Sequence, residues 1–204
     1  MQRENCWHCG KPAEDLFCRF CNALQPPVPD YYRFFGLEPK LDLDVAGLQR
    51  KFYHLSRNVH PDRYTRGSAR ERQFSLEASA ILNDAYRVLR DPVARAEYVL
   101  KNHGFDIGEQ RSRDVPPELL EEVFELNMAL EELREGDQSA RPSLEAARDR
   151  FVALRGGVDT QLGQLFREFD ATQDREVLAR IRGLLNRRRY IGNLVQQVEK
   201  ELAA

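Results

Sequence analysis

His60-Pro61-Asp62 separates two segments of helical patterning, and these three residues decide how we expect the chain to fold. The segment before them carries apolar residues that fall on one side of a helix, namely Leu48, Phe52, Leu55 and Val59. Pro61 lacks a backbone donor and disfavours helical backbone at the residue before it, so this helix is expected to end at the tripeptide. The segment after them repeats the apolar stripe until Asp91-Pro92 breaks it, at Phe74, Ala78, Ile81, Ala85, Val88 and Leu89. Two antiparallel helices packed through these stripes would put the tripeptide at an exposed tip.

The opposite side of the first of these helices is basic. It carries Arg50, Lys51, His54 and Arg57, and Asp42 or Asp44 can cap its start. A cationic face suits an acidic partner surface, and association through it would slow as salt is added. The alternative is that these charges only keep a helix face solvated.

Around the tripeptide, the chain resembles the J domain of DnaJ-type co-chaperones over about residues 30–102. The matching features are a short first helix within Asp30-Tyr31-Tyr32-Arg33-Phe34-Phe35-Gly36-Leu37, the basic second helix, the His-Pro-Asp, and Asn83-Asp84-Ala85-Tyr86-Arg87-Val88-Leu89-Arg90-Asp91-Pro92 in the third helix. Because the tripeptide lies between two matched helices, it is far more specific than the same three residues alone.

This resemblance implies docking on an ATP-driven chaperone of the heat-shock-seventy class and stimulation of its ATP hydrolysis. The implied chaperone-binding residues are His60, Pro61, Asp62, Arg50, Lys51, His54 and Arg57. Asp62 is an acceptor suited to an arginine of the partner. The alternative is a simple turn with an ordinary surface histidine. An enzyme would need His60 as a general base oriented by Asp62, but a proline separates them and no nucleophile motif lies nearby, so we expect no catalysis.

Composition favours a helical interaction protein. The chain has 204 residues, of which 42% are hydrophobic and 31% charged, and its net charge is -2. This charge argues against nucleic acid as the main partner, and no apolar run is long enough to span a membrane. Because Met1-Gln2-Arg3-Glu4-Asn5-Cys6 reads as neither a signal peptide nor a transit sequence, we expect the cytoplasm, or an organelle only after removal of a presequence.

All four cysteines form two C-x-x-C motifs near the start of the chain, at Cys6, Cys9, Cys18 and Cys21. Two such motifs can present four thiolates to one tetrahedral ion, so the spacing predicts one structural zinc. A segment of this size cannot bury a core, and the metal would supply its folding free energy. Two disulfides or a lone iron are the alternatives. His8 is expected to be a bystander, since four thiolates complete the set.

Two linkers divide the chain. Gln25-Pro26-Pro27-Val28-Pro29 reads as a stiff extended linker, and a loop through Gly104, Gly108 and Pro116-Pro117 follows Leu100. We therefore expect an all-α protein with a tetracysteine zinc module at residues 1–25, a J-domain helical hairpin at 30–102 and an antiparallel three-helix bundle at 114–204.

The predicted bundle rests on three segments with helical spacing of apolar residues. The first carries Leu119, Val123, Leu126, Leu130 and Leu133. The second carries Leu144, Ala147, Phe151, Leu154, Val158, Leu162, Leu165 and Phe169. The third carries Val177, Ile181, Leu184, Ile191, Val195, Val198 and Leu202. Pro117 and Pro142 suit helix starts and Gly136 a helix stop, whereas Gly156-Gly157 leaves open whether the second helix is continuous.

The first bundle helix carries a second apolar line that the core does not need. Leu120, Phe124 and Met128 lie roughly 100 to 180° away from the seam, and Tyr190 is displaced about as far from the seam of the last helix. Glu121 and Glu125 flank the line. It is a candidate partner surface. The alternative is that it packs against the J domain or against the other bundle helices.

A J domain followed by this bundle resembles the HscB family, co-chaperones of iron-sulfur cluster assembly. The resemblance covers residues 119–130 and Arg189-Tyr190-Ile191-Gly192-Asn193-Leu194, with Leu130 marking the register. It implies that the bundle delivers an IscU-type scaffold to an HscA-type chaperone, with scaffold-binding residues Leu120, Phe124, Glu125, Met128 and Tyr190.

Two departures from the better-known bacterial members stand out. Glu121 and Met128 replace a methionine and a glutamate, and the tetracysteine module is similar to that of eukaryotic members. The leading hypothesis is an adaptor between chaperone and scaffold, and the second is a general co-chaperone for unfolded clients. The role of the zinc module, a possible homodimer, the angle between J domain and bundle, and the physiological partners are left open.

Overall fold

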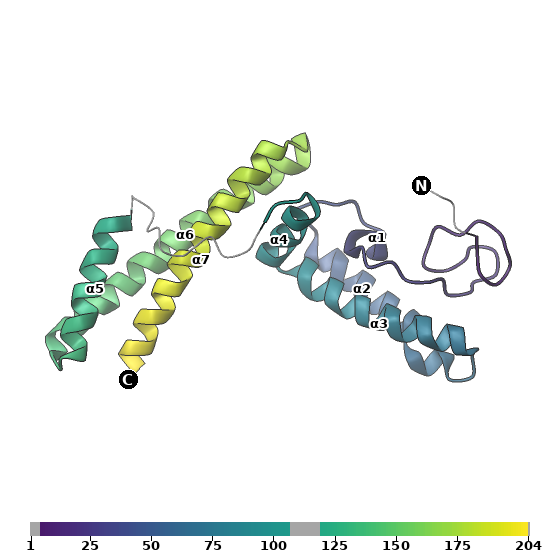
Figure 1. The fold of residues 1–204 in the computed structure, drawn as a ribbon, viewed down its shortest axis with the longest axis horizontal. Coiled ribbons are helices and arrows are strands. Elements are labelled where there is room, and N and C mark those ends of the chain that lie inside the picture. The colour runs from purple at the N-terminus through teal and green to yellow at the C-terminus, as the bar shows by residue number, and fades with distance from the viewer. Residues whose placement is uncertain (1–4, 107–118, 204) are drawn as a thin grey trace. The chain divides into compact units, whose positions relative to one another are not determined.

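The computed structural model describes residues 5–106 and 119–203, and helices are its dominant regular elements (Figure 1). The described residues contain no β-strand, only the isolated bridges Asn5–Pro12 and Phe17–Leu24. The chain divides into two compact units, residues 1–98 and 99–204. The predicted all-α class is therefore confirmed. The predictions for Gly108 and Pro116-Pro117, and for the first residues of the bundle, lie outside the described residues.

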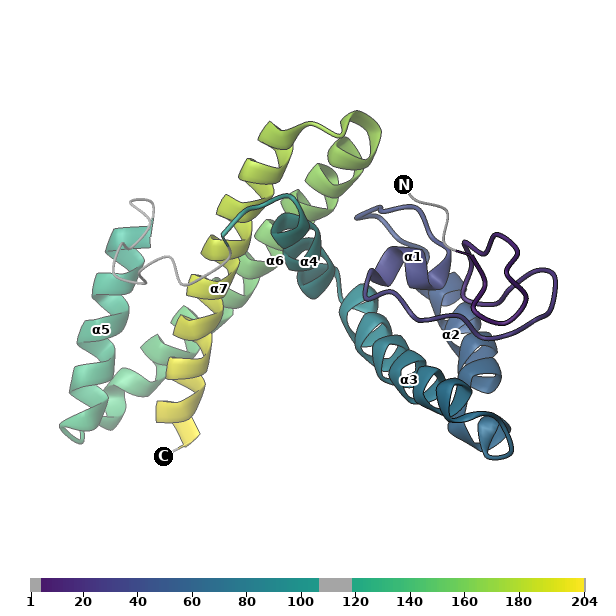
Figure 2. The same ribbon diagram turned by 45° about the vertical axis from the view of Figure 1, so that its right-hand side comes forward.

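The first unit holds the predicted helical hairpin. After α1 (Tyr31–Phe35), α2 (Val45–Val59) and α3 (Ala69–Arg90) run side by side, joined by the short 3-10 helix η1 (Pro61–Tyr64) (Figure 2). They pack largely through the predicted stripes, with buried side chains at Leu48, Val59, Ala78, Ala85 and Leu89. Leu82, which lies outside the predicted stripe, is also buried, whereas Ile81 within it is only partly buried.

Local capping residues set the ends of these helices. Asp30 accepts a hydrogen bond from the amide of Arg33 at 3.0 Å and begins α1. Ser68 and Glu71 form a reciprocal capping box that begins α3. Asp44 occupies the N-cap position of α2, but its carboxylate makes no capping hydrogen bond and lies 3.5 Å from the guanidinium of Arg50.

A fourth helix follows directly where the sequence pattern predicted only a break. α4 (Pro92–Asn102) starts at the proline that ends α3, because Asp91 accepts a hydrogen bond from the amide of Ala94 at 2.8 Å. Arg95 is buried and donates to the carbonyls of Leu41, at 2.9 Å, and of Leu89. Asp91-Pro92 is therefore both a helix stop and a helix start.

The second unit contains the three predicted bundle helices, α5 (Leu120–Arg134), α6 (Arg141–Thr172) and α7 (Arg175–Ala203). A 3-10 turn, η3 (Gln138–Ala140), joins α5 to α6. α6 runs without interruption through Gly156-Gly157, and Pro142 lies in its first turn as predicted. Gly136 has φ 99°, which explains the stop after α5, because such backbone favours glycine.

α6 and α7 form one long antiparallel pair, and the shorter α5 packs along part of α6 (Figure 1). The predicted seams are buried at Val123, Leu126, Leu144, Phe151, Phe169, Ile181, Ile191 and Val198. Ion pairs join the helices, namely Arg134–Glu201, Glu125–Arg150, Arg188–Asp159 and Arg180–Glu168. Among the described residues, no helix is long and apolar enough to cross a membrane.

Candidate functional site

The His-Pro-Asp turn is exposed at the end of the hairpin, as expected for a docking tip. The side chain of His60 is 54% exposed and that of Asp62 is 86% exposed. The amide of Asp62 donates to Nδ1 of His60 at 3.3 Å, and the same nitrogen lies 3.5 Å from an Asp62 carboxylate oxygen. With Nδ1 as acceptor, the neutral ring carries its proton on Nε2.

Side chains from η1 cap the end of α2 just before this turn. The guanidinium of Arg63 donates to the carbonyl of Arg57 at 3.3 Å and to the Asn58 side chain at 3.2 Å. The hydroxyl of Tyr64 donates to the carbonyl of Asn58 at 3.0 Å. The last carbonyls of a helix lack intrahelical partners, so these bonds fix how the chain leaves α2.

A second set of caps comes from α3. The hydroxyls of Ser75 and Ser79 donate to the carbonyl of Val59, at 2.6 and 3.2 Å. Ser75 has no exposed surface. Sequence analysis missed this pair, although two serines four residues apart, one of them beside the apolar stripe of a helix, were a visible signal.

The basic face of α2 is exposed, but its members differ in what they contact. Arg50 pairs with Asp44, and Nε2 of His54 lies 3.1 Å from Nδ2 of the Asn58 side chain. Lys51 donates to the carbonyls of Phe35 and Gly36 at the end of α1, at 3.2 and 3.3 Å. Lys51 therefore holds α1 in place in addition to any role in docking.

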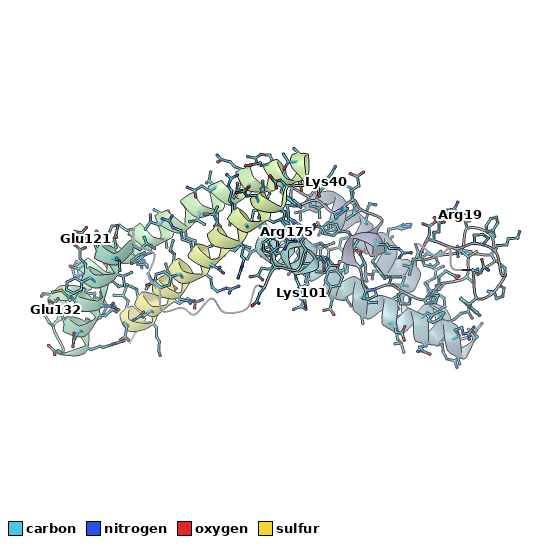
Figure 3. All side chains as sticks on the ribbon, turned by 45° about the horizontal axis from the view of Figure 1, so that its top comes forward. Arg19, Lys40, Lys101, Glu121, Glu132 and Arg175 are labelled. Carbon is cyan, nitrogen blue, oxygen red and sulfur yellow. The ribbon has the colours of Figure 1, made fainter. Side chains whose placement is uncertain are left out.

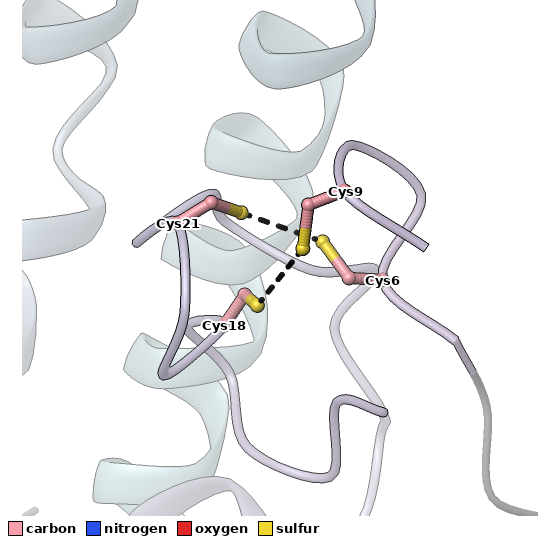
Figure 4. Close-up of side chains that lie close together, drawn as sticks. All are labelled: Cys6, Cys9, Cys18 and Cys21. Carbon is pink, nitrogen blue, oxygen red and sulfur yellow. Dashed lines mark hydrogen bonds between the residues drawn. The ribbon is translucent and has the colours of Figure 1, made fainter. Parts of the chain in front are cut away.

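The four cysteines meet in one cluster, with all four sulfurs within 4.8 Å of one another (Figure 4). The sulfurs of Cys6 and Cys21 are 3.6 Å apart, and those of Cys9 and Cys18 are 3.7 Å apart. Four sulfurs around a tetrahedral zinc at about 2.3 Å would be separated by about 3.8 Å. No disulfide joins these four cysteines, and their arrangement fits a metal ion.

The two C-x-x-C segments have the same backbone geometry. The carbonyl of Cys6 accepts from the amide of Gly10 at 2.9 Å, and that of Cys18 accepts from the amide of Asn22 at 2.7 Å. Gly10 and Asn22 both have left-handed backbone, with φ 71° and 59°. This turn aims backbone amides at sulfur, as the amide of His8 does at Cys6, at 3.4 Å.

The thiols perturb one another strongly. Burial opposes ionisation of Cys6, but hydrogen bonds from the amides of Cys9 and His8 and from neighbouring thiols lower its pKa to about 6. The amide of Ala23 favours the Cys21 thiolate, yet burial and the other three sulfurs raise its pKa to about 12. Four thiolates are therefore stable together only around a cation.

The apolar line on α5 is exposed. Leu120, Phe124 and Met128 are 55%, 66% and 49% exposed, so the other bundle helices do not bury this line. Glu121 projects from the same helix (Figure 3). Glu125 lies 3.6 Å from Arg150 of α6, which gives it an intramolecular partner as well.

Tyr190 lies on another helix of the bundle, α7, and is only half-buried. Its partial burial raises the pKa of its phenol. The predicted scaffold-binding residues therefore divide into an exposed apolar line on α5 and an aromatic side chain on α7.

Two known families match the chain, each over a different stretch. The DnaJ domain family matches residues 30–98, and the family described as the HSCB C-terminal oligomerisation domain matches residues 115–199. Both matches fall on the elements described above, the first on α1 to α4 and the second on the helical bundle.

Curated relatives match along most of the chain. The iron-sulfur cluster co-chaperone protein HscB of Homo sapiens is 31% identical over 201 residues, which covers 95% of this chain and 80% of the relative. The protein of the same name from Mus musculus is 30% identical over 201 residues, covering 95% and 81%. A co-chaperone protein HscB homolog of Vibrio vulnificus is 33% identical over 172 residues, covering 83% and 95%.

Solved structures of HscB proteins also match most of the chain. The crystal structure of the human co-chaperone protein HscB superposes with a TM-score of 0.74 at 30% identity, covering 96% of this chain and 97% of that one. The chaperone HscB from Vibrio cholerae gives a TM-score of 0.59 at 26% identity, covering 83% and 95%.

Proposed function

Because this chain belongs to the HscB family of iron-sulfur cluster co-chaperones, we propose that it couples an HscA-type chaperone to an IscU-type scaffold. The J domain would stimulate ATP hydrolysis by the chaperone, and the bundle would hold the scaffold. The observation that carries this proposal is that two unlike surfaces, one on each unit, are both exposed. One is a polar tip beside a cationic face, and the other is an apolar line.

The chemistry of each surface suits a different partner. His60, Asp62 and the cations of α2 offer charge and directional hydrogen bonds, which favour fast, salt-sensitive docking on an acidic surface. Leu120, Phe124 and Met128 offer apolar area with little charge, which favours a stable contact with a hydrophobic patch on a folded partner. Neither surface offers a nucleophile paired with a base, so we propose no catalytic role.

The adaptor function is tested by measuring ATP hydrolysis by an HscA-type chaperone with this protein, with an IscU-type scaffold, and with both. We expect the two together to stimulate hydrolysis more than the sum of their separate effects, because the protein holds the scaffold beside the chaperone. Strictly additive stimulation would refute the adaptor.

A general co-chaperone for unfolded clients is the second candidate, because an exposed line of leucine, phenylalanine and methionine can also hold non-native chains. Suppression of light scattering by unrelated denatured proteins, with no preference for a cluster scaffold, would favour it.

We propose zinc as the resident ion of the four cysteines. Four sulfur ligands at tetrahedral spacing suit zinc, and the ion would be structural and not catalytic, since all four positions are filled by protein. Four closely grouped cysteines without a disulfide also favour a reducing compartment such as the cytoplasm.

A further inference from the structure

The cysteine module packs on the third helix of the J domain. The ring of Trp7, inside the first C-x-x-C motif, meets Phe74 of α3 edge to face, with ring centroids 6.2 Å apart. The guanidinium of Arg70, one turn earlier on α3, lies 5.3 Å from the centroid of the Trp7 ring. Trp7 is itself fixed, because its Nε1 donates to the carbonyl of Leu24 at 2.7 Å. The module and the hairpin accordingly belong to one compact unit, despite the proline-rich linker between them.

The residue next to Phe74 holds the His-Pro-Asp turn. Ser75 is fully buried, and its hydroxyl donates to the carbonyl of Val59 at 2.6 Å. Val59 is the residue directly before His60. Adjacent helical residues point about 100° apart, so one turn of α3 contacts the module through Phe74 and the end of α2 through Ser75. A shift of this turn would therefore change where the chain leaves α2.

We propose that the cysteine module positions the His-Pro-Asp turn for chaperone activation, with Trp7 and Ser75 as positioning residues. This inference rests on the proposed co-chaperone function. Neither residue needs to touch the chaperone. Trp7 packs against the N-terminal half of α3. Ser75, in the same turn of α3 as the Trp7 contact, holds the carbonyl of Val59 through its hydrogen bond. The metal site would then set how well the tip is ordered, because Trp7 lies between the ligands Cys6 and Cys9.

The first measurement needs no chaperone. Hydrogen exchange of the backbone amides of His60 and of residues 62–64 should be faster in Trp7→Ala and in Ser75→Ala than in the parent. We expect roughly a three- to tenfold increase, the range for loss of one buried hydrogen bond or ring contact. Trp7→Phe keeps an aromatic ring and should recover most of the protection. Phe20→Ala is the matched control, because Phe20 is an exposed aromatic residue of the other C-x-x-C motif and lies beside Lys11.

The second measurement separates positioning from simple loss of folded protein. In a titration of chaperone ATPase activity, a misplaced tip on an intact cationic face should lower maximal stimulation several-fold and leave the half-saturating concentration within about twofold. Partial unfolding would instead raise the half-saturating concentration and leave the maximum unchanged. That second pattern, or exchange and stimulation equal to the parent in both variants, overturns the inference. If the parent itself fails to stimulate the chaperone, the proposed function falls, and the exchange measurement still decides whether the module orders the tip.

Discussion

At the scale of the residue, several side chains that the sequence assigns to a binding surface also contact other residues of this chain. Lys51 belongs to the basic face but also holds the end of α1, and Glu125 flanks the apolar line but pairs with Arg150. Replacing either would change the fold locally as well as a partner contact. His60 and Phe124 give cleaner tests, because both are exposed.

His60→Gln should abolish stimulation of chaperone ATP hydrolysis and leave scaffold affinity unchanged. Glutamine retains hydrogen-bonding capacity but not the imidazole geometry that accepts from the amide of Asp62. Steady-state ATPase assays and scaffold calorimetry on the same preparation check both halves. Equal stimulation by variant and parent would remove the tip from the docking surface.

Phe124→Ala should weaken scaffold binding by roughly 1 to 3 kcal/mol, as truncation of a central interface anchor does. Because Phe124 is exposed, the free energy of unfolding should change by less than about 0.5 kcal/mol. Leu126→Ala is the opposing control, since Leu126 is buried two residues away and its truncation should cost about 2 to 5 kcal/mol of stability. Calorimetry showing unchanged affinity for Phe124→Ala would refute the patch.

At the scale of the element, local sequence predicts where a helix begins or ends more reliably than it predicts whether a helix is interrupted. Asp91-Pro92 ends one helix and begins the next, and Gly156-Gly157 interrupts nothing. The glycine pair is tolerated because buried residues on either side, Phe151 and Val158, hold α6 in place. The pair still weakens the helix, because glycine loses more backbone entropy on folding than alanine.

Gly156→Ala and Gly157→Ala should therefore each stabilise the bundle by about 0.5 to 1 kcal/mol. Both positions are exposed within α6, and an added Cβ meets no atom within 4 Å. Gly136→Ala is the matched control and should destabilise, since its φ of 99° disfavours a side chain. Chemical denaturation followed by circular dichroism measures all three, and destabilisation by either of the first two would contradict the expectation.

At the scale of the whole molecule, the two proposed binding surfaces lie on different compact units. The cysteine cluster and the His-Pro-Asp tip belong to residues 1–98, and the apolar line belongs to residues 99–204. Changes in the first unit should therefore leave scaffold binding by the second intact.

Removal of the metal tests this separation. A strong chelator, or replacement of Cys18 and Cys21 by serine, should unfold the cysteine module and lower the stability of the first unit, because the ligands would lose the ion that holds them together. Scaffold affinity should stay within about twofold of the parent. Elemental analysis of untagged protein should give one zinc per chain. Iron in its place would refute the zinc assignment, and lost scaffold binding would refute independence of the units.

The sequence by itself determined the features that depend on near neighbours along the chain. The apolar stripes, Pro61 and the paired cysteine motifs were enough to predict the hairpin, its tip, the bundle and the metal cluster, because helical period, backbone restriction and ligand spacing are local. The exposed line through Phe124 was also visible, since it lies off the seam of its own helix.

Only the tertiary structure decided which distant side chains support those features. Trp7 meets Phe74 across 67 positions of sequence, and Ser75 reaches the carbonyl of Val59 across 16. Such contacts depend on how whole helices and the cysteine module pack, and a helical pattern records which face is apolar but not what lies against it. The His-Pro-Asp tip could be named from the sequence, whereas what holds it in place follows from packing alone.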